Sequence, residues 1–193
     1  MDREELRGLL QSSYVLFSCE GTAEAVCIEK LVEAGSMVVP RHNIVDDPIY
    51  FTPYTRLRKA DEIADRFLRT TFEGDGVSGL TICRVVDSRS ARFKLPRRLE
   101  ESCTVASLFT RPEIEMLVIH AVGAYDEWSR ASRRNRGLKP SEFCKGQLRL
   151  PRVKEGDFLK EFWDTHGIAE AIRAYDARRS HATDELSLGA LLV

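Results

Sequence analysis

An uninterrupted apolar run near the N-terminus is the feature that most constrains this chain. Residues 14–19, YVLFSC, show no alternation of apolar and polar side chains, and a glutamate and a glycine follow directly. This pattern predicts a strand buried on both faces, as in parallel sheets covered by helices. Further strands are predicted at 80–87, LTICRVVD, and at 103–109, CTVASLF. Because helical patterns separate the strands, we expect an α/β fold whose largely parallel sheet is flanked by helices.

Apolar spacing and breaker residues predict the other elements. SMVVP and NIV, at 36–40 and 43–45, are candidates for short strands, and 46–54 reads as a loop. Helices are expected over 22–34, ended by Gly35; over 55–71; over 112–134, as one helix or as two with a break at Gly123; and after Pro140 and Pro151.

No strong boundary divides the chain. We expect an α/β domain at 1–123 and a helical C-terminal extension at 124–193 that packs on it, with a single domain as the alternative. The end of the extension shows little pattern. A helical cap or a contact in a homo-oligomer is its expected role.

Charge and composition limit the classes of function. The 193 residues carry a net charge of -1, so any attraction to nucleic acid must be local. No apolar run approaches the roughly 20 residues of a membrane helix, and the acidic N-terminus is not a signal peptide. Five scattered cysteines without a C-x-x-C pair predict free thiols in a reducing cytoplasm.

Two predicted strands end in a carboxylate, Glu20 and Asp87. Ligands of open α/β sheets bind beyond the carboxyl ends of the strands, so neighbouring strands would bring both acids to one crevice. Mg²⁺ is commonly held by one or two carboxylates together with substrate phosphate, as metal-assisted phosphodiester chemistry requires. The alternative is that each acid is a solvated residue at a strand end.

A third acid, Glu115, falls on a mostly apolar helical stretch. A buried ionised carboxylate is costly unless it is paired or binds metal. A structural salt bridge with Arg84 or Arg111 is the alternative to a metal ligand. Glu113 follows Thr110 at the spacing of a helix capping box and is assigned that structural role.

These segments resemble a known family. YVLFSCEGTAE followed by a helix resembles the first motif of the TOPRIM fold, and TICRVVDSRS resembles its second. TRPEIEMLV is similar to the Asn-Pro-x-x-Glu stretch of the RloB-like branch of small TOPRIM proteins, which are related to OLD-family nucleases. The resemblance covers roughly residues 12–122.

The resemblance implies a nuclease that uses Mg²⁺ or Mn²⁺ to act on DNA or RNA, with a role in phage defence. It implies Glu20 as general acid/base or metal ligand and Asp87 as metal ligand, and Glu115 occupies the position of the third motif's glutamate. The chain has no phosphate-binding loop of the G-x-x-x-x-G-K-[ST] type, so a separate ATPase subunit would supply any ATP hydrolysis.

One residue departs from the family pattern. Arg89 stands where the second acid of an Asp-x-Asp pair is expected, and a cation there would repel Mg²⁺ or contact phosphate. Either Glu115 or Asp46 and Asp47 complete the site, or the chain is a catalytically degenerate module. Such a module would bind nucleic acid or a partner protein as a sensor or scaffold.

Two clusters of basic residues without acids predict contacts to the phosphate backbone, with solvated surface as the alternative. No basic stripe interleaved with aromatic residues, of the kind that stacks single-stranded bases, is identified. The clusters are Arg89, Arg92, Lys94, Arg97 and Arg98, and Arg130, Arg133, Arg134, Arg136 and Lys139.

Overall fold

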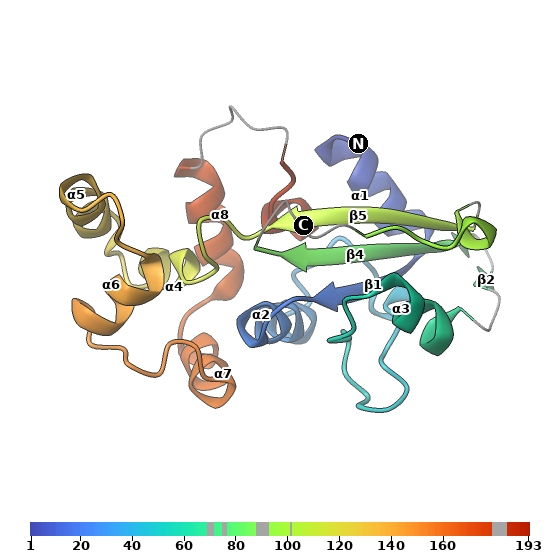
Figure 1. Cartoon of the computed structure of the whole chain (residues 1–193), viewed down its shortest axis with the longest axis horizontal. Helices are drawn as coiled ribbons and strands as arrows, with labels where there is room; N and C mark the ends of the chain where they lie inside the picture. Colours follow the sequence, from blue (N-terminus) through green and yellow to red (C-terminus); the bar gives the residue numbers. More distant parts are fainter. Residues whose placement is uncertain (69–71, 75–76, 88–92, 101, 179–184) are drawn as a thin grey trace.

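A three-stranded parallel sheet forms the centre of the molecule (Figure 1). The computed structural model describes residues 1–68, 72–74, 77–87, 93–100, 102–178 and 185–193. The predicted α/β fold with a parallel sheet flanked by helices is confirmed. In spatial order the strands are β1 (Tyr14–Cys19), β4 (Leu80–Val86) and β5 (Cys103–Phe109).

The register of the sheet fixes which residues share its carboxyl edge. Cys19 of β1 pairs with Val85 of β4, and Val86 pairs with Phe109 of β5. The residues that follow these strands therefore emerge at the same edge of the sheet. In Figure 1 all three arrowheads point toward the helices of the second half of the chain.

Both faces of the sheet are covered, which explains the lack of alternation in its sequence. Odd-numbered side chains of β1, such as Val15 and Phe17, belong to a large core that also takes in residues of α2, α4, α7 and α8. Leu16 points to the other face and joins a smaller cluster with Ile63 and Phe67 of α3. The helices are α1 (Arg3–Ser12), α2 (Thr22–Glu33), α3 (Ala60–Phe67), α4 (Met116–Ala121), α5 (Tyr125–Arg134), α6 (Pro140–Gly146), α7 (Gly156–Thr165) and α8 (Ile168–Arg178).

Short elements complete the structure. β2 (Glu73–Gly74) pairs with β3 (Val77–Ser78) in antiparallel orientation. Short 3-10 helices are η1 (Arg41–Asn43), η2 (Arg97–Leu99) and η3 (Leu188–Leu191). The short strands expected at 36–40 and 43–45 are reduced to isolated bridges, Met37 to Leu192 and Ile44 to Val15.

The helix expected over 55–71 is wrong in its first part. Within the described residues, which stop at 68 here, the helix comprises only Ala60–Phe67. Residue Thr55 instead extends alongside β1: its N–H donates to the carbonyl of Phe17 at 2.8 Å and its carbonyl accepts from Cys19 N–H at 2.9 Å. Pairing with the sheet overrides the local helical pattern at this edge.

The long helical stretch over 112–134 is two helices, α4 and α5, separated at Gly123 as anticipated. Gly123 adopts a φ of +70°, which glycine tolerates without strain. The capping box assigned to Thr110 and Glu113 is wrong, because α4 begins only at Met116. Glu113 instead accepts a hydrogen bond from the backbone N–H of Ser141 at 2.9 Å and so caps α6.

The end of the chain belongs to the core, although its sequence shows little pattern. Leu191 and Leu192 are buried, and the carbonyl of Leu191 accepts from Val38 N–H at 2.8 Å. Arg7 of α1 donates to the carbonyl of Leu192 at 2.7 Å. The largest core cluster combines side chains from both sides of Gly123, and the division into two domains stays a prediction.

The five cysteines are free and buried. Burial raises the pKa of the Cys83 thiol to about 12, so this side chain packs as a neutral apolar group. Among the described residues, no helix combines the length and the apolar character needed to cross a membrane.

Candidate active site at the carboxyl ends of the strands

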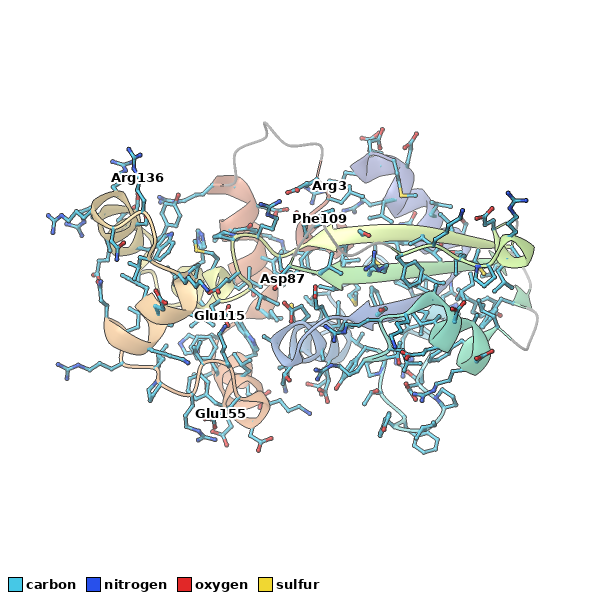
Figure 2. The ribbon with its side chains drawn as sticks, in the orientation of Figure 1. Arg3, Asp87, Phe109, Glu115, Arg136 and Glu155 are labelled. Carbon is cyan, nitrogen blue, oxygen red and sulfur yellow. The ribbon has the colours of Figure 1, made fainter. Side chains whose placement is uncertain are left out.

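Glu20 and Asp87 meet at the carboxyl edge of the sheet. The backbone N–H of Asp87 donates to Glu20 Oε2 at 3.1 Å, and the N–H of Glu20 donates to the carbonyl of Val85 at 3.0 Å. The Glu20 side chain is 26% exposed, and Asp87 is exposed beyond the end of β4 (Figure 2). The structure therefore brings together the two acids that the strand pattern singles out.

A further acid at this edge, Glu24, is absent from the sequence-based site. It lies in the first turn of α2, is only 6% exposed, and its Oε1 accepts from Thr110 Oγ1 at 3.3 Å. Thr110 follows β5 directly, so Glu24 links a third strand to the site. Gly21 leaves room for this carboxylate, because a Cβ at that position would collide with Glu24 Oε2.

A signal for Glu24 is present in the sequence. It precedes Cys27, Ile28 and Leu31 by three, four and seven residues, the spacing of a single helical face. If the helix includes this acid, its side chain lies on the same face as the apolar residues and is buried with them. Its position near the N-terminus of α2 is also electrostatically favourable for a carboxylate.

Glu115 is buried at the start of α4, as its apolar neighbours predict. Its ion pair is with Lys154, whose Nζ lies 3.6 Å from Glu115 Oε1, rather than with either of the arginines considered. Arg111 pairs with Glu185 at 3.3 Å, and Arg84 places its guanidinium 4.6 Å from the centre of the Phe93 ring. In Figure 2 Glu115 lies between the sheet and the C-terminal helices.

The buried acids influence each other. Burial raises the pKa of Glu24, and the negative charges of Glu115 and Asp87 raise it further. Burial likewise raises the pKa of Glu115, with Glu113 adding to the effect and Lys154 opposing it. We call Glu20, Glu24, Asp87 and Glu115 the acidic rim.

The acidic rim provides some, but not all, of the ligands that a divalent ion needs. In the described portion of the chain, no three acidic, histidine or cysteine side chains converge as a metal-chelating group. The rim offers only oxygen donors, and Glu20 and Asp87 match the one or two carboxylates with which Mg²⁺ is held when substrate phosphate completes the coordination. The arrangement suits an ion shared with a ligand rather than a closed protein cage.

Asp46 and Asp47 do not complete the acidic rim. Asp46 forms an ion pair with Arg41 at 2.8 Å. Asp47 is fully buried in a turn, where it accepts backbone hydrogen bonds from Ile49 and Tyr50. Burial opposes its ionisation, but these hydrogen bonds, together with one from Thr55 and the charge of Arg66, outweigh that effect and lower the pKa of Asp47. The suggestion that this pair supplies the missing ligands is therefore wrong.

Arg58 contacts the acidic rim and Arg56 lies next to it, and sequence reasoning does not identify either. Arg58 Nη1 lies 3.7 Å from Glu20 Oε1, and Arg56 Nη1 donates to Thr22 Oγ1 at 3.2 Å. Both side chains are exposed. The sequence pattern predicts a helix for this segment, whereas the chain pairs with β1 at Thr55 and continues past the end of that strand.

Only Lys94 and Arg97 of the basic cluster at 89–98 have described side chains. Arg89, Arg92 and the side chain of Arg98 lie outside what the structure describes, so the effect of Arg89 stays a prediction. Lys94 and Arg97 are exposed. However, η2 precedes β5 and therefore lies toward the amino end of the strands, away from the rim (Figure 1).

The second basic cluster lies on α5 and the loop that follows it. All five of its residues are exposed, and Arg130 and Arg134 line an open hollow with Asn135 and Gln147. Figure 2 shows Arg136 at the outer end of the helical half, well separated from Asp87. Only a long ligand could contact this cluster and the acidic rim at the same time.

Comparison of the chain with models of protein families, with curated proteins and with solved structures gives no match. The resemblance to TOPRIM proteins therefore stays a prediction, carried by the motifs and by the position of the acids.

Proposed function

We propose that this protein is a divalent-cation-dependent phosphodiester hydrolase acting on DNA or RNA, with a TOPRIM-like sheet capped by its C-terminal helices. The observation that carries the proposal is the contact between Glu20 and Asp87, at 3.1 Å from carboxylate to backbone N–H. Two acids that are distant in sequence but follow neighbouring strands meet at the edge where open α/β sheets bind ligands.

The chemistry requires that a water oxygen bonds to phosphorus while the bond to the leaving oxygen breaks; the leaving oxygen keeps the electron pair of that bond and takes up a proton from solvent. The proton of that water must go to a base, and Glu20 is the partly exposed carboxylate of the acidic rim. Glu20 is either this base or, with Asp87, a ligand of Mg²⁺ or Mn²⁺, and the ion would supply charge neutralisation at the phosphate and a more acidic water. Arg56 and Arg58 are placed to contact phosphate oxygens beside these acids.

Cleavage of labelled DNA and RNA, single-stranded and duplex, tests this function directly. We expect products with Mg²⁺ or Mn²⁺ and none with EDTA. Glu20→Gln should lower the rate by about 10² to 10⁴, the usual contribution of a general base. Glu4→Gln, an exposed acid on α1, is the matched control and should cleave like the wild type.

Metal binding has a separate readout. A ligand that binds only the folded state raises the melting temperature, so Mg²⁺ or Mn²⁺ should stabilise the wild type. Asp87→Asn should reduce that shift, whereas Glu4→Gln should keep it. A wild type that neither cleaves nor responds to either ion would refute the proposal.

The alternative is a catalytically degenerate TOPRIM-like module that binds nucleic acid or a partner protein as a sensor or scaffold. Arg58 favours it, because a guanidinium already lies beside Glu20. The absence of a three-residue chelating group in the described residues also favours it. Nucleic-acid binding that is the same for wild type and Glu20→Gln, without turnover in either, would support this module.

The cellular setting is also part of the proposal. Five free thiols favour a reducing cytoplasm. The lack of a phosphate-binding loop in the sequence leaves ATP hydrolysis to a separate ATPase subunit, in a role such as phage defence.

A further inference from the structure

The loop between Ile44 and Thr55 carries an aromatic tip. Ile49, Tyr50 and Phe51 are consecutive and are 55%, 69% and 83% exposed. Single exposed apolar residues are ordinary on protein surfaces, but a contiguous exposed group usually marks a binding site. Within the described residues, most of the surface of these three side chains is not used in packing.

The tip is held in a defined shape. The buried carboxylate of Asp47 accepts from the N–H groups of Ile49 at 3.0 Å and Tyr50 at 3.4 Å, and pairs with Arg66 at 3.3 Å. The backbone of Asp47 also bonds to Phe51 and to Thr52, each at 2.8 Å. The rings are therefore presented by a braced turn and not by a loose loop.

Phe51 adopts an unusual backbone conformation. Its φ of +55° lies in the left-handed region, which bulky residues rarely occupy. Residues kept in such conformations cluster at ligand-binding sites, where the surrounding structure holds them in place. A glycine would adopt this conformation more easily, so the turn itself does not require the ring of Phe51.

The chain leads from this tip to the acidic rim. Thr55 pairs in parallel with Ser18 of β1, so the residues after it run toward and past the end of that strand. Arg56 and Arg58 follow at the positions that contact Thr22 and Glu20. One segment, buried at Thr55 and exposed at both ends, thus joins an aromatic end to a cationic end beside the candidate active site, a combination that the sequence pattern did not reveal.

We infer that residues 49–58 bind single-stranded nucleic acid, with Tyr50 and Phe51 stacking on unpaired bases and Arg56 and Arg58 contacting the phosphates near Glu20. Single-strand binding sites combine cationic contacts to the backbone with aromatic rings that accept any base. Bases inside a duplex are already stacked and cannot reach such rings. This inference rests on the proposed function for nucleic acid as the ligand, and it specifies the unpaired form.

Binding of a fluorescent thymidine oligonucleotide, compared with a duplex of equal length, tests the inference. Measurements in EDTA exclude cleavage. Tyr50→Ala combined with Phe51→Ala should weaken single-strand binding at least about fivefold, the lower end of what one stacked base contributes, and leave duplex binding unchanged. Tyr50→Phe keeps the ring and should bind like the wild type.

Phe51→Gly separates binding from folding. Glycine adopts the same positive φ freely, so the turn should be retained and the melting curve should stay cooperative, while single-strand binding weakens. Equal affinity of this variant and the wild type would overturn the inference. So would a wild type that does not bind the oligonucleotide, an equal loss of duplex binding, or a change in oligomeric state that shows the tip to be a protein contact.

The two proposals can fail separately. Tip-dependent binding by a wild type that never cleaves would refute hydrolysis and keep the single-strand site. Cleavage that depends on Glu20, together with single-strand binding unaffected by the tip, would keep hydrolysis and overturn the single-strand site.

Discussion

At the scale of single residues, the buried carboxylate of Glu24 is expected to lower the stability of the fold while belonging to the candidate active site. It is almost fully buried with Thr110 as its hydrogen-bond partner, and the charges of Glu115 and Asp87 disfavour its ionisation. An arrangement of this kind is poor for stability and typical of functional sites.

We predict that Glu24→Gln stabilises the protein at neutral pH. The pKa of Glu24 is raised in the folded state, so folding is most favoured when the group is protonated, and stability is lost as the pH rises from about 4.5 through the folded-state value. The amide keeps the acceptor for Thr110 without the charge. The melting temperature should rise at pH 7.5, by about 2–4 °C for each kcal/mol gained, and match the wild type at pH 4. A lower melting temperature at pH 7.5 would contradict this prediction.

Only part of the acidic rim could be predicted from the sequence. Glu20 and Asp87 are visible because each directly follows an apolar strand, and the burial of Glu115 follows from its neighbours. Arg58 could not be identified, because its contact with Glu20 depends on an extended segment at the edge of the sheet. The partner of Glu115, Lys154, lies in a distant loop that no local pattern indicates.

At the scale of elements, predictions hold where one physical cause dominates. β1 and β4 are recognised because burial on both faces gives nearly continuous apolar runs. β5, which is only partly buried, is recognised by its β-branched and apolar residues, and Gly123 marks the break between α4 and α5. The predicted helix begins at 55, whereas α3 begins at Ala60, because Thr55 forms hydrogen bonds with β1 instead. Helix ends depend on tertiary contacts and are less well determined by sequence.

The junction of α4, α5 and α8 is expected to be sensitive to acid. His120 stacks on Tyr125 at 4.8 Å and meets the edge of Tyr175 at 5.8 Å. Burial lowers the pKa of His120, and the charge of Arg178 lowers it further. The unfolded chain therefore takes up the proton more readily, and stability falls as the pH drops below about 6.5.

Replacing His120 by Phe should remove this dependence while keeping an aromatic ring at the junction. We expect the free energy of unfolding in urea to fall less between pH 7.5 and 5.5 for His120→Phe than for the wild type. His42→Gln, at an exposed position, is the control and should behave like the wild type. An identical pH profile for His120→Phe and the wild type would show that His120 does not titrate in this range.

At the scale of the whole molecule, three strands alone make a small sheet, and the later helices complete its core. α7 and α8 pack on α2, and α8 also packs on α4. Leu191 and Leu192 enter the same core from the end of the chain, beside Val38 and Met37. Hydrophobic periodicity could not predict this, because the segment contains neither a strand nor a long helix.

We predict that residues 1–123 do not fold on their own. Removing the rest of the chain would expose the face of α2 that α7 and α8 cover, together with Val38 and Met37. The fragment should lack a cooperative thermal transition in circular dichroism, whereas the full chain should melt in one step. A cooperative transition in the fragment would instead support two domains divided at Gly123.

The contact between Arg58 and Glu20 affects how a divalent ion would bind at the acidic rim. Arginine keeps its charge at all ordinary pH values, so an arriving divalent ion would exchange with a guanidinium instead of entering an empty position. The guanidinium released in this exchange would be free for a phosphate. Uptake of the ion and uptake of the polyanion would then be thermodynamically linked, each strengthening the other by the same factor.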